Sequence, residues 1–177
     1  MKRFFLIGIT VMVGVLLIVF LGGTAPETNQ EFLRIHIRAH SNSQADQHVK
    51  YLVKDAVVDV MIPLLVTIQS KDEAHHVVQQ NFPMIEATAN RVLAANGFTY
   101  TARARMVADE FPTRSYGNGF TLEGGFFDAI FLELGDGRGD NWWCVVYPPL
   151  CFLGGSGTNG QNIIYRWKII DIINGFR

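Results

Sequence analysis

Asn96-Gly-Phe-Thr-Tyr-Thr-Ala-Arg-Ala-Arg-Met106 is the stretch at which the spacing of apolar residues along the chain changes. Before Asn96, apolar residues recur three and four positions apart, which is typical of one face of an α-helix. After Gly97 they alternate with threonine and arginine, as in a strand with one face in water. Asn96-Gly97 itself is a common helix end. The sequence therefore predicts an α+β fold, with a helical N-terminal half packed on an antiparallel sheet from the C-terminal half.

Helices are expected between about residues 46 and 96. Ser43 with Asp46, and Ser70 with Glu73, have the spacing of N-terminal caps, because a serine hydroxyl can accept a free backbone N–H three residues further on. The apolar stripe of these helices needs a sheet to cover it.

The sheet is expected to be built mainly from Phe98 to Tyr147, with Phe32 to Arg38 joining it. Strand alternation divides the side chains of the joining segment between two faces. We expect its buried face to carry Leu33, Ile35 and Ile37, and its solvent face to carry Arg34, His36 and Arg38.

Both faces of the strand are apolar, rather than one buried and one in solvent, in the segment Asn141-Trp-Trp-Cys-Val-Val-Tyr-Pro-Pro-Leu-Cys-Phe152. Trp142 points to one face and Trp143 to the other. Such a strand is either covered on both faces or keeps one face for a partner protein. The glycine-rich residues Gly135 to Asp140 lead into it and are predicted to form a tight hairpin.

Cys144 and Cys151 are the two cysteines of the sequence. In an unbroken strand they would lie roughly 20 Å apart, whereas a disulfide needs Cα atoms within about 7 Å. Pro148-Pro149 ends the strand because neither residue has an N–H to donate, so the chain turns there. In an exported chain a disulfide is the favoured hypothesis, and a pair of buried thiols is the alternative.

The chain opens with Lys2-Arg3 and then eighteen uncharged residues, Phe4 to Leu21. As a helix this segment would be about 27 Å long, which nearly crosses the apolar core of a bilayer. We interpret residues 1–25 as a signal peptide or an N-terminal membrane anchor, and residues 26–153 as an exported α+β domain. The membrane is therefore an expected partner through the N-terminal segment.

Residues 154–177 are interpreted as a linker followed by an amphipathic helix. Its apolar stripe comprises Ile163, Ile164, Trp167, Ile170 and Ile173. Such a stripe either docks on the domain or lies on a membrane surface.

Several function classes are disfavoured by the sequence. The formal net charge of −1 lacks the basic excess of nucleic-acid binding proteins. His36 and His40 lie four residues apart, but apart from Asp46 no third ligand is near, so no metal or cofactor is expected. Cys144 lies within a strand, and no ordered set of nucleophile, histidine and acid stands out. We therefore predict no catalytic residue, nucleic-acid partner or small-molecule substrate.

Two blocks of sequence carry a family resemblance. The first comprises Leu33-Arg-Ile-His-Ile37, Ser41-Asn-Ser43, Asp46-Gln47, Lys50 and Lys54-Asp55. The second comprises Phe111-Pro-Thr-Arg-Ser-Tyr-Gly117, Thr121-Leu-Glu-Gly-Gly125, Leu134-Gly-Asp-Gly-Arg-Gly-Asp-Asn-Trp-Trp-Cys144 and Tyr147-Pro-Pro-Leu-Cys-Phe152. In this order they resemble the stage II sporulation protein R family, although His40 and Asn42 stand where that family usually has Asn and Asp.

The resemblance implies a secreted signalling protein that is made in the forespore and exported into the space between the forespore and mother-cell membranes. There it would activate, by contact alone, a membrane-embedded aspartic protease of the mother-cell membrane that processes a precursor sigma factor. The alternatives are an exported hydrolase acting on cell wall, with a cysteine or metal centre, and a purely structural anchored domain.

The candidate partner-binding residues come from both blocks. They are polar or aromatic at positions where the pattern of a buried core predicts neither kind of residue. They are Arg34, His36, Ser41, Asp46, Gln47, Arg114, Tyr116, Asp140, Trp142 and Trp143. If they converge, they form a cluster of aromatic and arginine side chains, the composition that dominates binding at protein interfaces. The alternative is that Arg34 and Arg114 pair with Asp46 and Asp140 to hold loops together.

Overall fold

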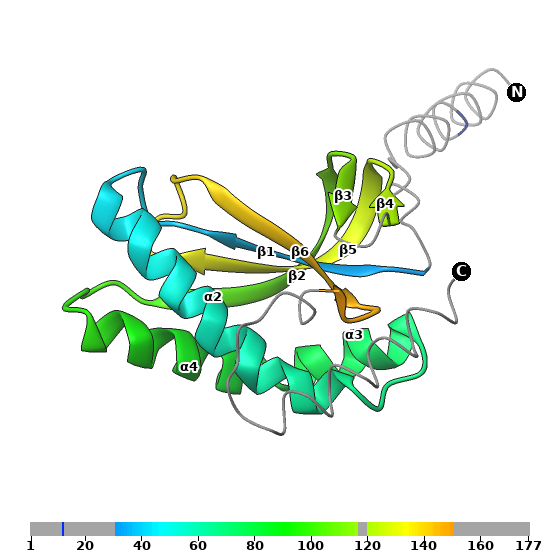
Figure 1. Ribbon diagram of the computed structural model, residues 1–177, viewed down its shortest axis with the longest axis horizontal. Helices are drawn as coiled ribbons and strands as arrows, with labels where there is room; N and C mark the ends of the chain where they lie inside the picture. Colours follow the sequence, from blue (N-terminus) through cyan, green and yellow to red (C-terminus); the bar gives the residue numbers. More distant parts are fainter. Residues whose placement is uncertain (1–11, 13–30, 117–119, 151–177) are drawn as a thin grey trace, which may run out of the picture.

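A first strand, three helices and then five more strands follow one another along the described chain (Figure 1). The computed structural model describes Met12, residues 31–116 and residues 120–150. The elements are β1 (Leu33–Arg38), α2 (Gln44–Leu65), α3 (Lys71–Gln80), α4 (Phe82–Ala95), β2 (Ala102–Phe111), β3 (Arg114–Tyr116), β4 (Phe120–Leu122), β5 (Gly125–Leu134) and β6 (Asn141–Tyr147). This arrangement confirms the predicted α+β fold class. Apart from Met12, the predicted leader lies outside the described residues, as does the predicted C-terminal helix.

α2 and α3 begin where the serine caps predicted them. The hydroxyl of Ser43 accepts a hydrogen bond from the backbone N–H of Asp46 at 3.1 Å, and Ser70 does the same for Glu73 at 3.2 Å. These bonds satisfy N–H groups that a helix leaves free in its first turn. After α4, Gly97 adopts a positive φ of 80°, which favours glycine at this helix end. Across residues 31–116 and 120–150 no helix is both long and apolar enough to cross a membrane.

The four-stranded sheet has the order β2-β5-β1-β6 and is mixed rather than fully antiparallel. β2 with β5, and β1 with β6, are antiparallel, whereas β1 with β5 is parallel. Parallel neighbours need a long crossover, and the chain between β1 and β5 includes three helices. The prediction of an antiparallel sheet was therefore wrong for this one pair of strands.

β1 lies between β5 and β6, which overturns the predicted hairpin at Gly135–Asp140. Strands joined by a tight hairpin would be direct neighbours, but β5 and β6 both pair with β1. The loop instead passes over the end of β1. Its backbone contacts the residues that follow β1, with Gly139 N–H bonded to Ala39 O at 2.9 Å and Arg138 N–H to His40 O at 3.1 Å.

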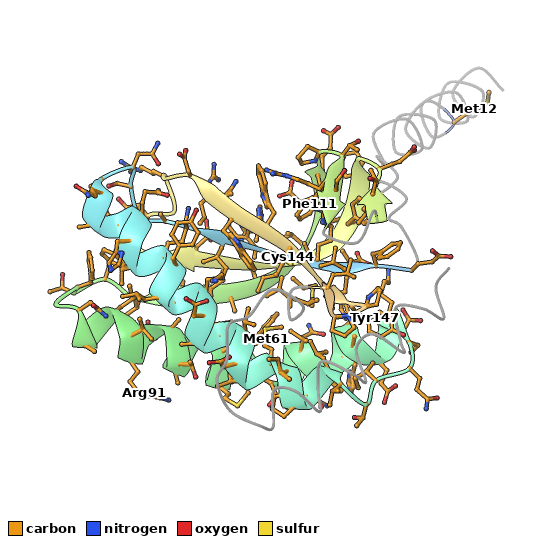
Figure 2. The ribbon with its side chains drawn as sticks, in the orientation of Figure 1. Met12, Met61, Arg91, Phe111, Cys144 and Tyr147 are labelled. Atoms are coloured by element: carbon orange, nitrogen blue, oxygen red, sulfur yellow. The ribbon has the colours of Figure 1, made fainter. Side chains whose placement is uncertain are left out.

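The main core lies between the sheet and the helices. From β1 it takes Leu33, Ile35 and Ile37, which are fully buried as predicted, and from α2 it takes Val53, Val57, Met61 and Leu65. Figure 2 shows Met61 on this helix side of the sheet. Burying an aliphatic side chain of this size stabilises the fold by about 1.5–3 kcal/mol.

A smaller core lies on the opposite face, beside the β3–β4 hairpin. Its buried members are Phe32, Phe111, Leu122, Phe127, Ala129, Val145 and Leu150. Because this second cluster covers them, the polar side chains of β1 do not face solvent: Arg34 is 0% exposed and His36 is 3% exposed. The prediction that these two residues face solvent was wrong, since β1 is a central strand and large aromatic residues from its neighbours cover its polar side.

Candidate partner-binding face

Strand register brings the two blocks of sequence together on the sheet face opposite the helices. Arg105 of β2, Phe131 of β5, His36 of β1 and Trp143 of β6 lie side by side in one row. We call the group around this row the aromatic–arginine face. It comprises Arg34, His36, Arg105, Asp109, Phe111, Arg114, Phe127, Phe131 and Trp143.

His36 is the centre of this face. Its Nδ1 accepts a hydrogen bond from the indole Nε1–H of Trp143 at 3.2 Å. Its Nε2 lies 3.2 Å from Oδ2 of Asp109, although the two atoms do not form a hydrogen bond. The imidazole also packs edge-on against Phe131, with ring centroids 4.2 Å apart. His36 therefore joins β1 to β2, β5 and β6 through side chains alone.

The charge state of His36 follows from its surroundings. The pKa of His36 is lowered from 6.5 to about 4. Burial is the largest cause, the nearby Arg38, Arg105 and Arg34 also lower the pKa, and Asp109 opposes them. The imidazole is therefore neutral near pH 7. Since Nδ1 accepts from Trp143, the remaining hydrogen is assigned to Nε2, on the side of Asp109.

Arg34 is part of the support beneath the face and does not contact solvent. Its guanidinium lies 4.0 Å from the ring centroid of Phe111 and 5.0 Å from that of Phe127. A guanidinium stacks well on aromatic rings because it is planar and weakly hydrated. With 0% exposure, Arg34 cannot contact a partner unless the domain rearranges.

Arg114 occupies the accessible side of the same cluster. It begins β3, is exposed, and places its guanidinium 5.1 Å from the ring centroid of Trp143, which is itself half-buried. Tyr116 ends β3 in register with Phe120 of β4. Among the described residues, ion pairs join neither Arg114 nor Arg34 to Asp46 or Asp140, so the loop-pairing alternative is wrong.

Trp142 lies apart from this face. It packs against the helix-side core, and Lys54 of α2 lies 5.8 Å from its ring centroid. Trp142 and Trp143 therefore point to opposite faces, as strand alternation predicts. Only Trp143 belongs to the aromatic–arginine face.

The remaining candidates form a second cluster at the end of the sheet, centred on Asp46. Its carboxylate accepts hydrogen bonds from the hydroxyls of Ser41 and Ser43 at Oδ2 and of Tyr100 at Oδ1. Burial alone would raise the pKa of Asp46, but these hydroxyl bonds, with His40, lower it below its ordinary value. Asp46 is 6% exposed, so this carboxylate is a structural anchor.

The loop before β6 docks on the same cluster. Asp140 N–H bonds to Asn42 Oδ1 at 2.7 Å, and its carbonyl accepts from the buried Nζ of Lys50 at 3.1 Å. Gln47 Nε2 donates to Ser41 O at 2.9 Å and so ties α2 to the connection between β1 and α2. A Cβ on Gly139 would meet Ser41 O at 2.2 Å, so only glycine permits this approach. Ser41, Gln47 and Asp140 thus hold the two blocks in place.

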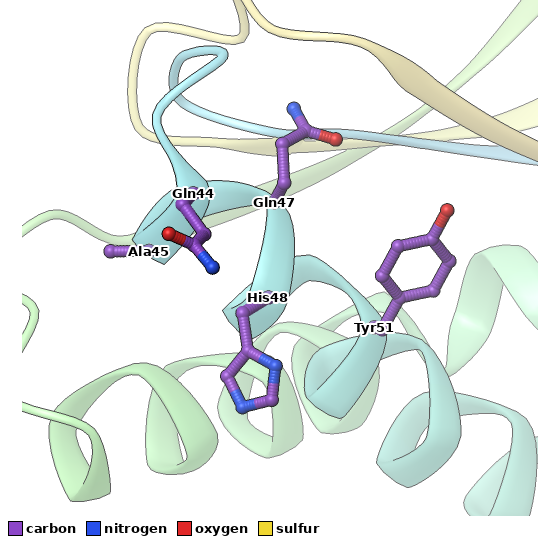
Figure 3. A pocket seen from close by; sticks show the side chains of 5 residues that line it. All are labelled: Gln44, Ala45, Gln47, His48 and Tyr51. Carbon is purple, nitrogen blue, oxygen red and sulfur yellow. The ribbon is translucent and has the colours of Figure 1, made fainter.

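An open hollow of about 570 Å³ lies beside the first turns of α2 (Figure 3). It is lined by Gln44, Ala45, Gln47, His48 and Tyr51. Figure 3 shows that all five come from this one helix, so the hollow does not join elements distant in sequence. Within the described parts of the chain, no group of three His, Cys, Asp or Glu side chains is placed to hold a metal ion.

Five members of the aromatic–arginine face were not predicted from the sequence: Arg105, Asp109, Phe111, Phe127 and Phe131. In the sequence of β2, Val107, Asp109 and Phe111 alternate with Met106, Ala108 and Glu110. This alternation could have placed the first three residues on one face. The pairing of β5 with β1 could not be found in the same way, because it depends on strand order.

The fold and this face define an α+β domain that presents aromatic and arginine side chains on the sheet face away from its helices. Within that class, the chain belongs to the stage II sporulation protein R family: residues 29–156 match the family described as Stage II sporulation protein R. The chain is 37% identical over 131 residues to Stage II sporulation protein R of Bacillus subtilis (strain 168). That alignment covers 74% of this chain and 57% of the relative.

The chain thus spans less than two thirds of the length of that relative. No solved structure matches it. Family membership confirms the resemblance found in the two blocks and supports a role in sporulation.

Proposed function

We propose that this sporulation protein is an exported signalling protein that acts by contact. It leaves the forespore, enters the space between the forespore and mother-cell membranes, and binds a membrane-embedded aspartic protease of the mother-cell membrane. Binding switches on the protease, which then processes a precursor sigma factor. The protein itself performs no chemical step in this scheme.

One observation carries the proposal: two blocks far apart in sequence meet on one sheet face. Trp143 from the second block donates a hydrogen bond to His36 from the first, and Arg114 from the second block lies over the ring of Trp143. Tryptophan and arginine are enriched among the residues that carry binding energy at protein interfaces. Cys144, the nucleophile that a cysteine hydrolase would need, is buried at 7% exposure.

The test is reconstitution of the full chain with the protease and its precursor in lipid vesicles, followed by measurement of precursor cleavage. Wild-type protein is expected to start cleavage. Arg114→Ala should lower cleavage about 30-fold at sub-saturating concentration, because a central interface residue contributes about 2 kcal/mol or more. Arg91→Ala is the matched control, since Arg91 is exposed on α4, on the helix side of the sheet (Figure 2). Cleavage that does not depend on the wild-type chain would refute the proposal.

A further inference from the structure

Three arginines share one carboxylate at one end of the aromatic–arginine face. Strand register places Arg103 of β2, Glu133 of β5 and Arg38 of β1 side by side in one row. Arg105 lies two positions further along β2, opposite Phe131. Side chains two positions apart on a strand point to the same face, so all four charged groups lie on the side of the sheet opposite the helices. We call Arg38, Arg103, Arg105 and Glu133 the arginine end.

Glu133 forms an ion pair with only one of these three arginines. Its Oε2 lies 3.3 Å from Nε of Arg105, and the guanidinium of Arg105 also lies 4.2 Å from the ring centroid of Phe131. Among residues 31–116 and 120–150, no carboxylate forms an ion pair with Arg38 or Arg103. The arginine end therefore keeps two positive charges that its own carboxylate does not pair.

Arg38 and Asn141 are neighbours across the sheet, and each has an unused hydrogen-bonding atom. They are register partners on β1 and β6, and both side chains are half-buried. Nε of Arg38 is a buried donor and Oδ1 of Asn141 is a buried acceptor, and neither atom forms a hydrogen bond within the described chain. Burying such atoms without partners costs free energy, which a ligand that bonds both would recover. The pair therefore favours a ligand that presents an acceptor and a donor close together.

We propose that the arginine end, together with Asn141, binds an acidic residue of the partner protein. The inference rests on the proposed function, because the partner is the protease that the protein activates. A carboxylate accepts two N–H groups from one guanidinium, which makes its pair with Arg38 stronger and more directional than a bond to a neutral acceptor. The backbone N–H of the acidic residue supplies the donor for Oδ1 of Asn141. Arg103 is exposed and adds attraction to the same negative charge.

The distance between two rows of the sheet sets the spacing of the bound segment. Arg38 and Asn141 form one row, and His36 and Trp143 form the next row, two positions away along both strands. Two positions on a strand correspond to about 7 Å. Side chains on one face of an extended segment have the same spacing. We therefore expect the partner to present an apolar residue to Trp143 and an acidic residue, two positions away, to Arg38.

An anionic membrane surface fits the arginine end less well than one acidic side chain. Polybasic segments that bind such membranes carry about four to eight Lys and Arg residues. Here Glu133 lies among the arginines, and the loop that crosses the end of β1 adds the exposed carboxylates of Asp136 and Asp140. A flat layer of headgroup phosphates would approach these carboxylates as well as the arginines. A single side chain can contact the arginines and avoid this repulsion.

Charge changes in the full chain, reconstituted with the protease in lipid vesicles, test the contact. Arg38→Gln and Arg103→Glu should each lower activation at least tenfold at sub-saturating concentration. Arg103 is exposed, so the second variant should keep the Tm of wild type. Arg91→Glu is the matched control, an exposed arginine on α4, and should stay within twofold of wild type. Full activation by both face variants would overturn the inference and leave the proposed function intact, whereas failure of wild-type protein to activate refutes the proposed function.

A double-mutant cycle identifies the acidic residue and separates contact from a loss of folding. Each Asp and Glu on the outward-facing segments of the protease is replaced in turn by Asn or Gln. At one position the replacement should lower activation about tenfold with the wild-type chain but less than twofold with Arg38→Gln, because the contact is then already absent. Losses that add at every position would show that Arg38 contacts no acidic residue and would overturn the inference.

Lipid composition and self-association test the other occupants. The loss of activation in Arg103→Glu should be the same in neutral phosphatidylcholine vesicles and in vesicles with added anionic phosphatidylglycerol. A loss confined to the anionic vesicles would assign the arginine end to the membrane and overturn the proposal. Sedimentation of the free chain in detergent is expected to show no dimer that Arg103→Glu abolishes. Such a dimer would assign the arginine end to a second copy of the chain and would also overturn the proposal.

Discussion

Trp143 of β6 and His36 of the neighbouring β1 are joined by a side-chain hydrogen bond, in which the indole Nε1–H donates to Nδ1 of the imidazole at 3.2 Å. Only a neutral imidazole with its hydrogen on Nε2 can accept this bond. The bond therefore requires His36 to stay uncharged in the folded protein. It also fixes the orientation of the ring over which Arg114 lies.

Stability should therefore fall on mild acidification. The folded-state pKa of His36 is about 4, below its unfolded value of 6.5. Between these values the unfolded chain binds more protons, so the free energy of unfolding decreases as the pH falls from 6.5 to 4. From this residue alone the loss at pH 5 should be about 2 kcal/mol. Urea unfolding at pH 7 and pH 5 measures it.

His36→Asn is the control for this pH effect. Its amide oxygen can still accept from Trp143, but the side chain does not titrate. The variant should be less stable than wild type at pH 7, because asparagine fills less of the site. Its stability should change less between pH 7 and pH 5. An equal pH dependence in the two proteins would show that another group is responsible.

Asp46 should be a large contributor to stability, not to binding. Asp46→Ala removes the acceptor of the Ser41, Ser43 and Tyr100 hydroxyls, and we expect a loss of about 3 kcal/mol at pH 7. Because its folded pKa is lowered, the wild-type contribution is present at neutral pH and is lost as the pH falls below about 4. Chemical unfolding at pH 7 and pH 3 measures both effects.

Asp55→Ala is the matched control for Asp46→Ala. Asp55 lies on the same helix, and 66% of its side chain is exposed beside Lys54. Exposed ion pairs contribute about 0–1 kcal/mol, so this variant should be close to wild type. Equal losses for the two substitutions would contradict the anchoring role of Asp46.

Local sequence signals were enough to predict the caps, the helix end at Gly97 and the alternation of β6. Each depends on residues close together in the chain, as with the Ser43 cap, which lies three residues from Asp46. The sequence also placed Leu33, Ile35 and Ile37 correctly in the core. Fold class followed from these local patterns.

The order of the strands in the sheet could not be predicted from such local patterns. Polar residues that alternate with apolar ones are typical of a strand with one solvent-exposed face, so the pattern predicts that Arg34 and His36 face solvent. They are buried because β5 and β6 both pair with β1 and because Phe111 and Phe127 close over Arg34. Such long-range pairing leaves no periodic signal in one sequence, and the hairpin at Gly135–Asp140 was wrong for the same reason.

The disulfide stays a prediction, because Cys151 lies outside the described residues. We expect Cys144 and Cys151 to be bonded in the exported protein. Alkylation without reduction, followed by mass spectrometry, should then modify neither cysteine. Reduction should lower the free energy of unfolding by about 2–3 kcal/mol in the chain-entropy model. Two alkylated cysteines before reduction would reject the bond.

Arg34 and Arg114 should respond in opposite ways to the same substitution. Arg34 is 0% exposed and stacks on Phe111 and Phe127. Arg34→Ala therefore leaves a cavity between the two rings, and we expect a loss of about 3 kcal/mol in stability. Arg114 is exposed over Trp143, so Arg114→Ala should change stability by less than about 0.5 kcal/mol while reducing activation.

Measuring Tm and protease activation on both variants distinguishes a residue that stabilises the face from a residue that contacts the partner. If Arg34 acts only beneath the face, Arg34→Ala loses activation in proportion to its unfolded fraction and regains it at a lower temperature, where more of the variant is folded. Arg114→Ala should not regain activation in this way, since its fold is intact at both temperatures. A variant of Arg34 that stays folded but does not activate the protease would place this arginine at the interface. The burial of Arg34 predicts the opposite result. A strongly destabilised Arg114→Ala would show that the exposed arginine holds the β3–β4 hairpin and would remove it from the binding surface.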